Sequence, residues 1–258
     1  MASSSRARRA CRQAPRVELH GKVALVTGGA RRVGRAIALE LARQGASIAL
    51  HHHQAIEAAG ATAAEIKALG VEVATIGADL ADPAEIDVLA QAVVERFGGV
   101  DLLVNSAAIY FRSPVGEVTA ADWDRLHALN LRAPFLLTQA LASTLRERHG
   151  RVVMITDIGG ERPWPGYLPY GASKAGLIYL TRGFAKVLAP EVLVNAVSPG
   201  TVLPPESASA EDIAAEVRRT ALKRLPAPED VARAVAFLCA ADAITGQVLA
   251  VESGKLLG

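Results

Sequence analysis

Cysteine is scarce in this sequence, and several features that define whole classes of protein are missing. The chain has 258 residues and two cysteines, Cys11 and Cys239, too few for a disulfide framework or a cysteine-rich metal site. No apolar run approaches the roughly 20 residues that a membrane span needs. The sequence shows no internal repeat and no sign of a second domain. We therefore expect a protein of the reducing cytoplasm that does not cross a membrane.

Neither positive nor negative charge is in large excess, but the charged residues are unevenly distributed along the chain. The formal net charge is +2. Residues 1–19 contain five arginines and one glutamate, a balance of +4, which leaves the remainder slightly acidic. Arginine-rich segments act in some proteins as targeting peptides or nucleic-acid-binding arms. This one has no apolar segment and precedes a complete fold pattern, so we predict a disordered tail and no nucleic-acid partner.

Hydrophobic residues are abundant, at 51% of the chain, which is enough for a large core. From residue 22 onward, short apolar runs alternate with helical patterns. Such alternation predicts a single α/β domain over residues 20–258, a Rossmann-type, doubly wound parallel sheet of about seven strands. We expect strands near 22–27, 47–51, 71–76, 100–104, 151–156, 192–197 and 247–251, and helices near 33–44, 54–69, 83–97, 119–148, 168–188, 211–219 and 228–240.

The first βα unit contains a turn that bears several glycines. An apolar run at residues 23–26 is followed by the segment 27–34 and then by a helical pattern that ends at Gly45. The unit, with its next strand, fits into about thirty residues, as a βαβ motif does. Glycines let the backbone approach a pyrophosphate, and the helix N-terminus offers free N–H groups. This turn therefore predicts a dinucleotide site.

A tyrosine and a lysine stand four residues apart in the segment 157–174. Tyr170 and Lys174 share one face if a helix begins near the tyrosine. A nearby ammonium favours the ionised phenol and lowers its pKa, so we expect Tyr170 to donate a proton near neutral pH. Asp157 lies thirteen residues before the tyrosine, just after a predicted strand.

Taken together, these motifs resemble the short-chain dehydrogenase/reductase family over residues 21–258. The turn at 27–34, Asn105 with Ala107, Asn130, and Pro199 with Gly200 follow the order and spacing of the family's motifs. The resemblance implies that Asn130, Tyr170, Lys174 and Asp157 form the catalytic group. It implies a cofactor site of Thr27, Gly28, Arg31, Arg32, Val33, Gly34, His53, Asp79, Leu80, Asn105, Ala107, Tyr170, Lys174, Pro199 and Gly200.

Two departures from the general family pattern point to the pteridine reductase subfamily. Arg32 replaces the middle glycine of the turn, and Asp157 replaces the catalytic serine. Pteridine reductases carry both substitutions. Tyr110 and Tyr167 fall where that subfamily places an aromatic residue on the pterin and a tyrosine beside the acid. The resemblance therefore implies a reductase of dihydropterins whose substrate site contains Arg32, Tyr110, Asp157 and Tyr167.

The chemistry of a carboxylate supports the same hypothesis. Adjacent residues on a strand point to opposite faces, so Thr156 and Asp157 cannot both face the site, and the spacing favours Asp157. An ionised carboxylate would repel the charge that develops on a ketone oxygen. It would stabilise a C=N substrate whose carbon receives hydride from NADPH while its nitrogen receives a proton through Tyr170. The alternative is that Asp157 is a structural carboxylate.

The end of the second strand indicates NADPH. An NAD site places an acidic residue there for the ribose 2′-hydroxyl, whereas a 2′-phosphate needs cations. Here residues 51–54 are three histidines and a glutamine, and Arg31 can reach the same place. Pteridine reductases often have Arg-Ser where this chain has Gln54 and Ala55, which weakens the phosphate site. His51 and His53 share a strand face, but no third ligand is visible, so we predict no metal site.

Two other functions fit the same motifs. One is reduction of another carbonyl, such as a 3-oxoacyl thioester, with Thr156 or water replacing the serine. The other is a non-catalytic sensor or scaffold that binds NADPH, although an intact Asn130, Tyr170 and Lys174 argue against it. The helices at 119–148 and 168–188 have larger apolar faces than one sheet can bury. Because such helices pair between subunits in the family, we predict a homotetramer.

Overall fold

The computed structural model describes residues 18–204 and 208–257. Most of the predicted tail, and residues 205–207 of the predicted loop at 201–210, lie outside these ranges. The described strands form one parallel sheet in the order β3-β2-β1-β4-β5-β6-β7. This confirms the predicted fold class. The strands are β1 (Val23–Val26), β2 (Ser47–His52), β3 (Val73–Gly77), β4 (Leu102–Asn105), β5 (Arg151–Ile155), β6 (Leu193–Pro199) and β7 (Val248–Val251).

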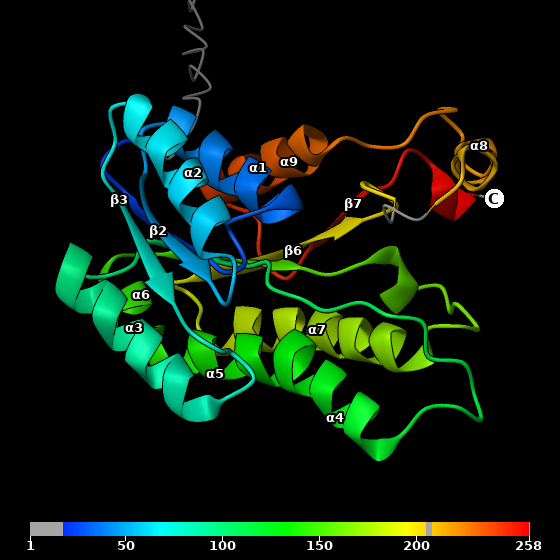
Figure 1. Cartoon of the computed structure of the whole chain (residues 1–258). Helices are drawn as coiled ribbons and strands as arrows, with labels where there is room; N and C mark the ends of the chain where they lie inside the picture. The colour runs from blue at the N-terminus through cyan, green and yellow to red at the C-terminus, as the bar shows by residue number, and fades with distance from the viewer. Residues whose placement is uncertain (1–17, 205–207, 258) are drawn as a thin grey trace, which may run out of the picture.

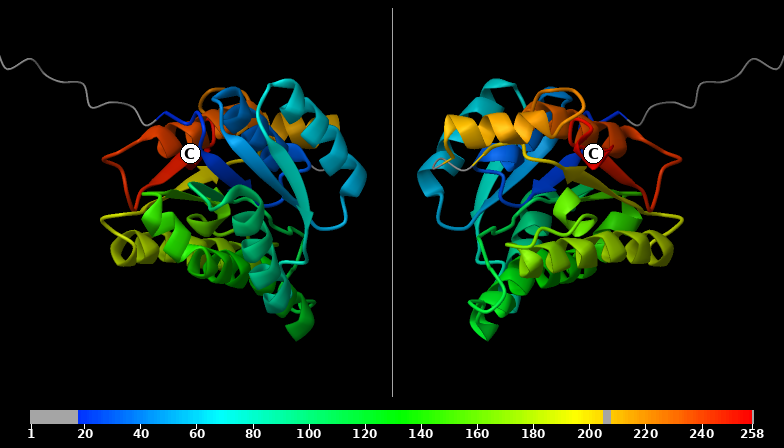
Figure 2. Two further views of the ribbon diagram at one scale, coloured as in Figure 1. Left: turned by 90° about the vertical axis from the view of Figure 1, so that its left-hand side faces the viewer. Right: turned by 90° about the vertical axis from the view of Figure 1, so that its right-hand side faces the viewer.

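Helices cover both faces of the sheet (Figure 1), and the two side views show them as separate layers (Figure 2). One layer contains α1 (Arg32–Arg43), α2 (Ile56–Ala68) and α9 (Pro228–Ala240). The other contains α3 (Pro83–Phe97), α4 (Ala120–His127), α5 (Ala133–Ala140), α6 (Ala142–Glu147) and α7 (Leu168–Val187). Helix α8 (Ala210–Arg218) lies beyond the ends of β6 and β7, beside the C-terminus (Figure 1). In the described ranges, no helix is long and apolar enough to cross a membrane.

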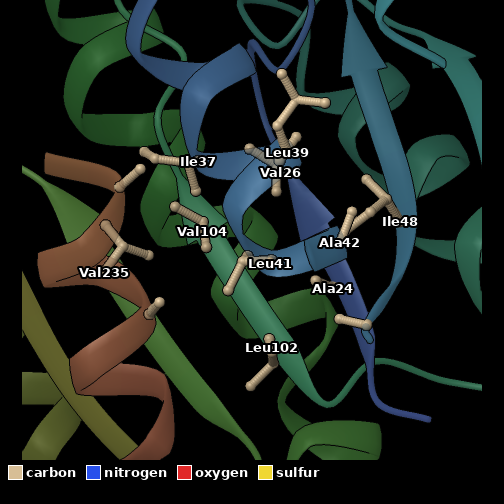
Figure 3. Close-up of a cluster of buried hydrophobic side chains, with 14 of the residues drawn as sticks. Ala24, Val26, Ile37, Leu39, Leu41, Ala42, Ile48, Leu102, Val104 and Val235 are labelled. Carbon is tan, nitrogen blue, oxygen red and sulfur yellow. The ribbon is translucent and has the colours of Figure 1, made fainter. Parts of the chain in front are cut away.

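The central strands β1 and β4 are buried along their whole length, because helices cover both of their faces. Alternate residues enter different cores. Val26 and Val104 pack toward α1 and α9, where Ile37 and Val235 meet them (Figure 3). Leu25 packs on the opposite face, in the core under α3, α5 and α7. This burial orders the strands and brings their C-terminal ends to one edge of the sheet.

Most predicted helix and strand boundaries agree with the structure within two residues, and local signals explain why. Helix α3 is an example. The side chain of Asp82 accepts a hydrogen bond from the amide of Ala84, and Pro83 occupies the first turn. Gly98 then ends the helix in the left-handed region, at φ 72°. These are favourable start and stop residues of a helix, and all of them are visible in the sequence.

The single helix predicted at residues 119–148 is wrong in one respect. The structure divides it into α4, a π-helical turn η1 (Ala128–Arg132), α5 and α6. Pro134 lies just after the π turn and has no N–H to donate to the carbonyl of Asn130, four residues earlier. The widened turn contains Asn130 itself. Single π turns inside helices are frequent at functional sites, and this one adjoins the candidate site.

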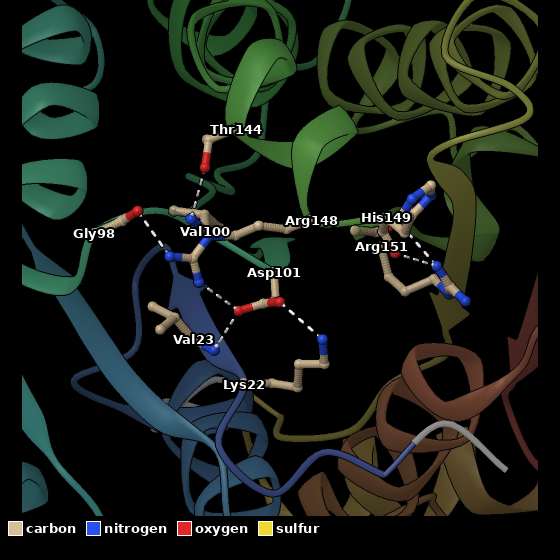
Figure 4. A network of polar contacts seen from close by, with 10 residues as sticks. Lys22, Val23, Gly98, Val100, Asp101, Thr144, Arg148, His149 and Arg151 are labelled. Atoms are coloured by element: carbon tan, nitrogen blue, oxygen red, sulfur yellow. Dashed lines mark hydrogen bonds and ion pairs between the residues drawn. The ribbon is translucent and has the colours of Figure 1, made fainter.

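A buried carboxylate fixes the opposite ends of the strands. Asp101, which precedes β4, accepts hydrogen bonds from Lys22 Nζ at 3.0 Å, from Arg148 Nη1 at 3.0 Å and from the amide of Val23 at 2.9 Å (Figure 4). Its partners come from the start of β1 and from the segment after α6. The interaction therefore secures the edge of the sheet that is remote from the candidate site.

Candidate active site

The glycine turn joins β1 to α1 at the C-terminal edge of the sheet. Thr27 Oγ1 accepts hydrogen bonds from the amides of Ser106 and Ala107, at 2.9 and 3.0 Å, and so ties the turn to the end of β4. Gly28 has φ 64°, and a Cβ atom there would lie 3.0 Å from Ala107 Cα. A Cβ atom on Gly34 would lie 2.2 Å from the carbonyl oxygen of Gly28. The turn is therefore as tight as a pyrophosphate-binding turn requires.

Two arginines follow in this turn. Arg31 precedes α1, and its side chain makes no hydrogen bond or ion pair with the described residues. Arg32 stands in the left-handed region at φ 53°, which costs a non-glycine residue about 1 kcal/mol. Its Nη2 donates to the carbonyl of Leu203 at 2.7 Å. Arg32 thus connects the turn to the loop after β6, whose preceding residues include Pro199 and Gly200 at the strand end.

The glycine turn is supported by His51, a histidine to which the sequence analysis assigned no role. The amide of Gly28 donates to His51 Nδ1 at 3.1 Å, so the proton of the ring lies on Nε2, which donates to the carbonyl of Ala78 at 3.0 Å. Burial lowers the pKa of His51 to about 4. The ring is therefore neutral at physiological pH and links β1, β2 and β3 at the site edge.

His53 lies apart from His51. It is largely exposed, with Nε2 3.9 Å from Asp79 Oδ2. Asp79 accepts a hydrogen bond from the amide of Ala81, and Leu80 between them is buried. Residues 18–204 and 208–257 contain no cluster of three or more groups that could hold a metal ion.

The predicted acid, tyrosine and lysine meet at the ends of β5 and α7. The hydroxyl of Tyr170 donates to Asp157 Oδ2 at 3.0 Å, and the other carboxylate oxygen accepts from the amide of Gly159 at 2.6 Å. Lys174 Nζ donates to the carbonyl of Ile155 at 2.9 Å and lies 5.7 Å from the centre of the Tyr170 ring. Tyr170 and Lys174 are 6% and 3% exposed, so the pair is shielded from water.

The charge states differ from the expectation drawn from sequence. Burial, together with the charge of Asp157, raises the pKa of the Tyr170 phenol well above its usual value, whereas the sequence predicted a lowered one. Burial lowers the pKa of Lys174 to about 8, against the opposing charge of Asp157. Burial also raises the pKa of Asp157, although the amide of Gly159, Lys174 and Tyr170 oppose that rise. At neutral pH the phenol therefore keeps its proton, which suits a proton donor.

The side chains of the two predicted asparagines are engaged within the fold. Asn130 accepts from the amide of Ile109 at 2.9 Å and donates to its carbonyl at 3.0 Å, which anchors the π turn against the segment after β4. Asn105 donates to Thr138 Oγ1 at 3.3 Å and is buried. Thr156 faces away from the site, as expected from strand alternation, and its hydroxyl donates to the carbonyl of Val197 at 3.0 Å.

An aromatic wall extends from Tyr170, the predicted proton donor. Tyr110 contacts Tyr170 edge to face, with ring centres 4.9 Å apart. Tyr167 stacks on Tyr110, with ring centres 4.6 Å apart and ring planes 8° apart. Tyr167 therefore covers one of the two faces of the Tyr110 ring, on which a substrate ring was expected to stack. Trp164 contacts Tyr167 at 6.2 Å. The three outer rings line a cavity of about 1010 Å³, and Tyr110 lies between this cavity and Tyr170.

The far side of this cavity contains a polar cluster that sequence reasoning missed. Lys255, from the C-terminal turn η3 (Lys255–Leu257), forms an ion pair with Glu216 of α8 and donates to Thr201 Oγ1 at 3.1 Å. Its ammonium lies 5.3 Å from the centre of the Trp164 ring. Sequence offers no signal for this cluster, because its members come from separate segments that meet only in the folded chain.

Comparison with known proteins agrees with this geometry. The family described as enoyl-(acyl carrier protein) reductase matches residues 28–255. A 3-oxoacyl-[acyl-carrier-protein] reductase from Synechocystis is 37% identical over 246 residues, which cover 93% of this chain and 98% of that protein. The chain belongs to the short-chain dehydrogenase/reductase family.

Solved structures of this family have the same fold. A short-chain dehydrogenase from Burkholderia cenocepacia in complex with NADP is 37% identical, with a TM-score of 0.87 over 93% of this chain and 99% of that one. A blue fluorescent protein from a metagenomic library in complex with NADPH is 36% identical, with a TM-score of 0.87 over 92% and 99% of the two chains.

The relatives overturn the function that the two sequence departures predicted. The curated relatives at 36–38% identity, which match over nearly their whole length, are 3-oxoacyl-[acyl-carrier-protein] reductases. Pterin reduction, as the reaction of this chain, is therefore wrong, and the alternative, reduction of a 3-oxoacyl thioester, fits better. The pterin prediction rested on two substituted positions, Arg32 and Asp157, whereas the similarity to the 3-oxoacyl-[acyl-carrier-protein] reductases extends over nearly the whole chain.

The tight glycine turn of this short-chain dehydrogenase/reductase gives a direct test of the cofactor site. In Gly34→Ala the new methyl group meets the backbone oxygen of Gly28, and no side-chain rotation relieves the clash. We expect a lower melting temperature and about tenfold or more weaker binding of NADPH, the predicted cofactor, in a fluorescence titration. Gly60→Ala in α2, where the added carbon meets nothing within 4 Å, is the control. Unchanged NADPH affinity in Gly34→Ala would contradict this account of the turn.

Proposed function

We propose that this chain is an NADPH-dependent reductase that converts the 3-oxo group of an acyl thioester to a hydroxyl. The observation that carries the proposal is the buried Tyr170 hydroxyl, protonated at neutral pH and adjacent to Lys174. The similarity to 3-oxoacyl-[acyl-carrier-protein] reductases over nearly the whole chain supports the substrate class. A sensor or scaffold would have no need of a shielded proton donor, which argues against that alternative.

The cofactor is NADPH, as predicted from the sequence, and family members have been solved with NADP and NADPH. The residues of this chain fit it. The closely packed Gly28 and Gly34 leave room for a pyrophosphate at the start of α1. The turn that contains Arg31 lies next to the end of β2, because the amide of Gly29 donates to the carbonyl of His51, and residues 51–55 contain no acidic residue for a ribose 2′-hydroxyl. When bound, NADPH supplies the hydride.

Reduction of a carbonyl adds a hydride to carbon and a proton to oxygen, and Tyr170 is positioned to give the proton. Lys174 holds a positive charge below about pH 8 and stabilises the phenolate that remains. We propose that the carbonyl of Asn130, which cannot accept a hydrogen bond from Pro134, holds a water that returns the proton. We assign Asn130, Tyr170 and Lys174 to this path.

Asp157 takes the place where the family pattern has a serine hydroxyl. An ionised carboxylate would repel the oxyanion that develops during reduction. A protonated carboxyl has one O–H donor and Tyr170 has one, so in the reactive complex both groups can point their protons at the substrate oxygen. Because burial raises the pKa of Asp157, the neutral acid is more accessible here than at the surface. We propose that protonated Asp157 donates to the substrate oxygen as the serine does in the family pattern.

The test of this function is NADPH oxidation with the acetoacetyl thioester of N-acetylcysteamine. Tyr170→Phe should lower kcat/KM by about 10²–10⁴-fold, because it removes the general acid. Tyr179→Phe, on the exposed side of the same helix, should behave as wild type. Turnover of dihydrobiopterin without turnover of the thioester would contradict the proposal.

Cofactor preference tests the role of Arg31. One charge-assisted hydrogen bond contributes about 1.5–3 kcal/mol, so Arg31→Ala should narrow the preference for NADPH over NADH by one to two orders of magnitude. Arg43→Ala, at the other end of α1, should leave the preference unchanged. Equal affinity of the wild-type chain for both cofactors would rule out this assignment.

We propose that the chain forms a homotetramer. Three apolar side chains on one face of α5 and α7 remain exposed, Phe135 at 38%, Tyr179 at 76% and Val187 at 68%, and a cavity of about 920 Å³ lies beside the first two. Light scattering should give about four times the chain mass of 26.9 kDa. Phe135→Glu should dissociate the assembly, while Val88→Glu on α3 should not. A wild-type monomer at micromolar concentration would disprove the tetramer.

A further inference from the structure

The two ends of the cavity behind Tyr110 differ in chemistry. At the end nearer Tyr170 the cavity is bordered by the ring of Tyr110, which contacts Tyr170, and the aromatic wall continues through Tyr167 and Trp164. The wall ends at the ammonium of Lys255. A substrate that extends from the reacting carbonyl along these rings would therefore bring its far end to a cation.

The polar cluster at this end carries a net positive charge. Glu216 pairs with Lys255 on one side and with Arg219 Nη1, at 2.7 Å, on the other. Although burial opposes it, the hydrogen bonds from Lys255 and Thr201 lower the pKa of Glu216. One carboxylate thus balances two cations, and one positive charge is left uncompensated.

The rest of the cavity lining has the same sign. Its other ionisable groups include Arg218 and Lys223, whereas Asp212 is the only further acidic residue among the described lining residues. Asp212 is engaged in the cap of α8, where it accepts from Ser209 Oγ at 2.6 Å. Lys255 differs from the arginines and lysines of the rim because its side chain is only 14% exposed. A partly buried ammonium attracts an anion more strongly than an exposed one does.

We propose that Lys255, with Thr201 and Arg219, forms an oxyanion-binding subsite for a charged group of the substrate, and that Glu216 orients these residues. The inference rests on the proposed thioester reduction for the identity of the reacting carbonyl. The ligand is a carboxylate at the end of the acyl chain or a phosphate of the thioester carrier, both of which present the same oxygen acceptors. Lys255 is in this account a specificity-determining residue, not a proton donor.

Three substrates distinguish a carboxylate of the acyl chain from a phosphate of the carrier as the ligand of this subsite. The neutral acetoacetyl thioester of N-acetylcysteamine has no anionic group, acetoacetyl-4′-phosphopantetheine adds a phosphate, and the 3-oxoadipyl thioester of N-acetylcysteamine adds a carboxylate. Lys255→Met should raise KM for the anionic substrate that uses the subsite by about 10- to 100-fold, with kcat nearly unchanged. KM for the neutral thioester should not change.

Two further variants guard against a purely structural effect. The combined variant Lys255→Met with Glu216→Gln leaves no unpaired carboxylate, and it should show the same loss as Lys255→Met. Lys67→Met removes an exposed lysine of α2, far from the cavity, and should leave KM unchanged for all three substrates. Equal KM ratios of anionic to neutral substrate in the wild type and in both Lys255 variants would overturn the subsite.

Calorimetry distinguishes failure of the subsite from failure of the proposed function. Adipate and pantetheine 4′-phosphate are titrated into the full chain in the presence of NADPH. Binding of either by the wild type, lost in the combined variant, supports the subsite even if no thioester is reduced. Absence of binding by the wild type for both ligands overturns it, whether or not the neutral thioester is a substrate.

Discussion

Burial of β1 and β4 on both faces is the constraint on which the rest of the structure depends. The apolar residues of these strands are covered by α1 and α9 on one side and by α3, α5 and α7 on the other, so the two strands lie at the centre of the sheet, where they pair in parallel. Their C-terminal ends then lie side by side. The glycine turn follows β1 and Asn105 ends β4, so the same burial that stabilises the core also assembles the cofactor site.

A second constraint is the low exposure of Tyr170 and Asp157, the two groups proposed to donate to the substrate. Tyr170 and Asp157 share one hydrogen bond in a place where burial raises both pKa values. A surface tyrosine and aspartate would be a protonated phenol and a carboxylate that act independently. Here the charge of one group determines the proton affinity of the other, and Lys174 provides the nearest compensating charge. The family pattern obtains a hydrogen-bond donor from serine at every pH, whereas Asp157 provides one only when it is protonated.

The fold was predictable because its signals are local. Asp82, Pro83 and Gly98 mark the ends of α3, and the glycines of the turn mark the start of α1. The interruption of the helix at 119–148 was visible as Pro134, but its consequence for Asn130 depends on how the turn packs. The catalytic residues could be proposed from sequence because Asp157, Tyr170 and Lys174 keep fixed spacings in the chain.

The residues that sequence reasoning missed have no such spacing. His51 supports the glycine turn through Gly28 and Ala78, which are distant in the chain, so the run of three histidines gave no sign of this role. Lys255 reaches the cavity only because the C-terminal turn folds beside α8. The predicted substrate was wrong for another reason, since Arg32 and Asp157 are only two positions, whereas the relatives that are 3-oxoacyl-[acyl-carrier-protein] reductases match nearly the whole chain.

The central claim is that Asp157 is protonated when it donates to the substrate oxygen. The pH dependence of kcat/KM for a neutral 3-oxo thioester tests this claim most directly. The wild-type rate should rise as pH falls through the raised pKa of Asp157, because the protonated acid donates to the substrate oxygen. It should decline above about pH 8 as Lys174 loses its proton. In Asp157→Asn, whose amide donates at every pH, the acidic rise should disappear while the decline above about pH 8 persists. A wild-type rate that falls as Asp157 becomes protonated would contradict the account.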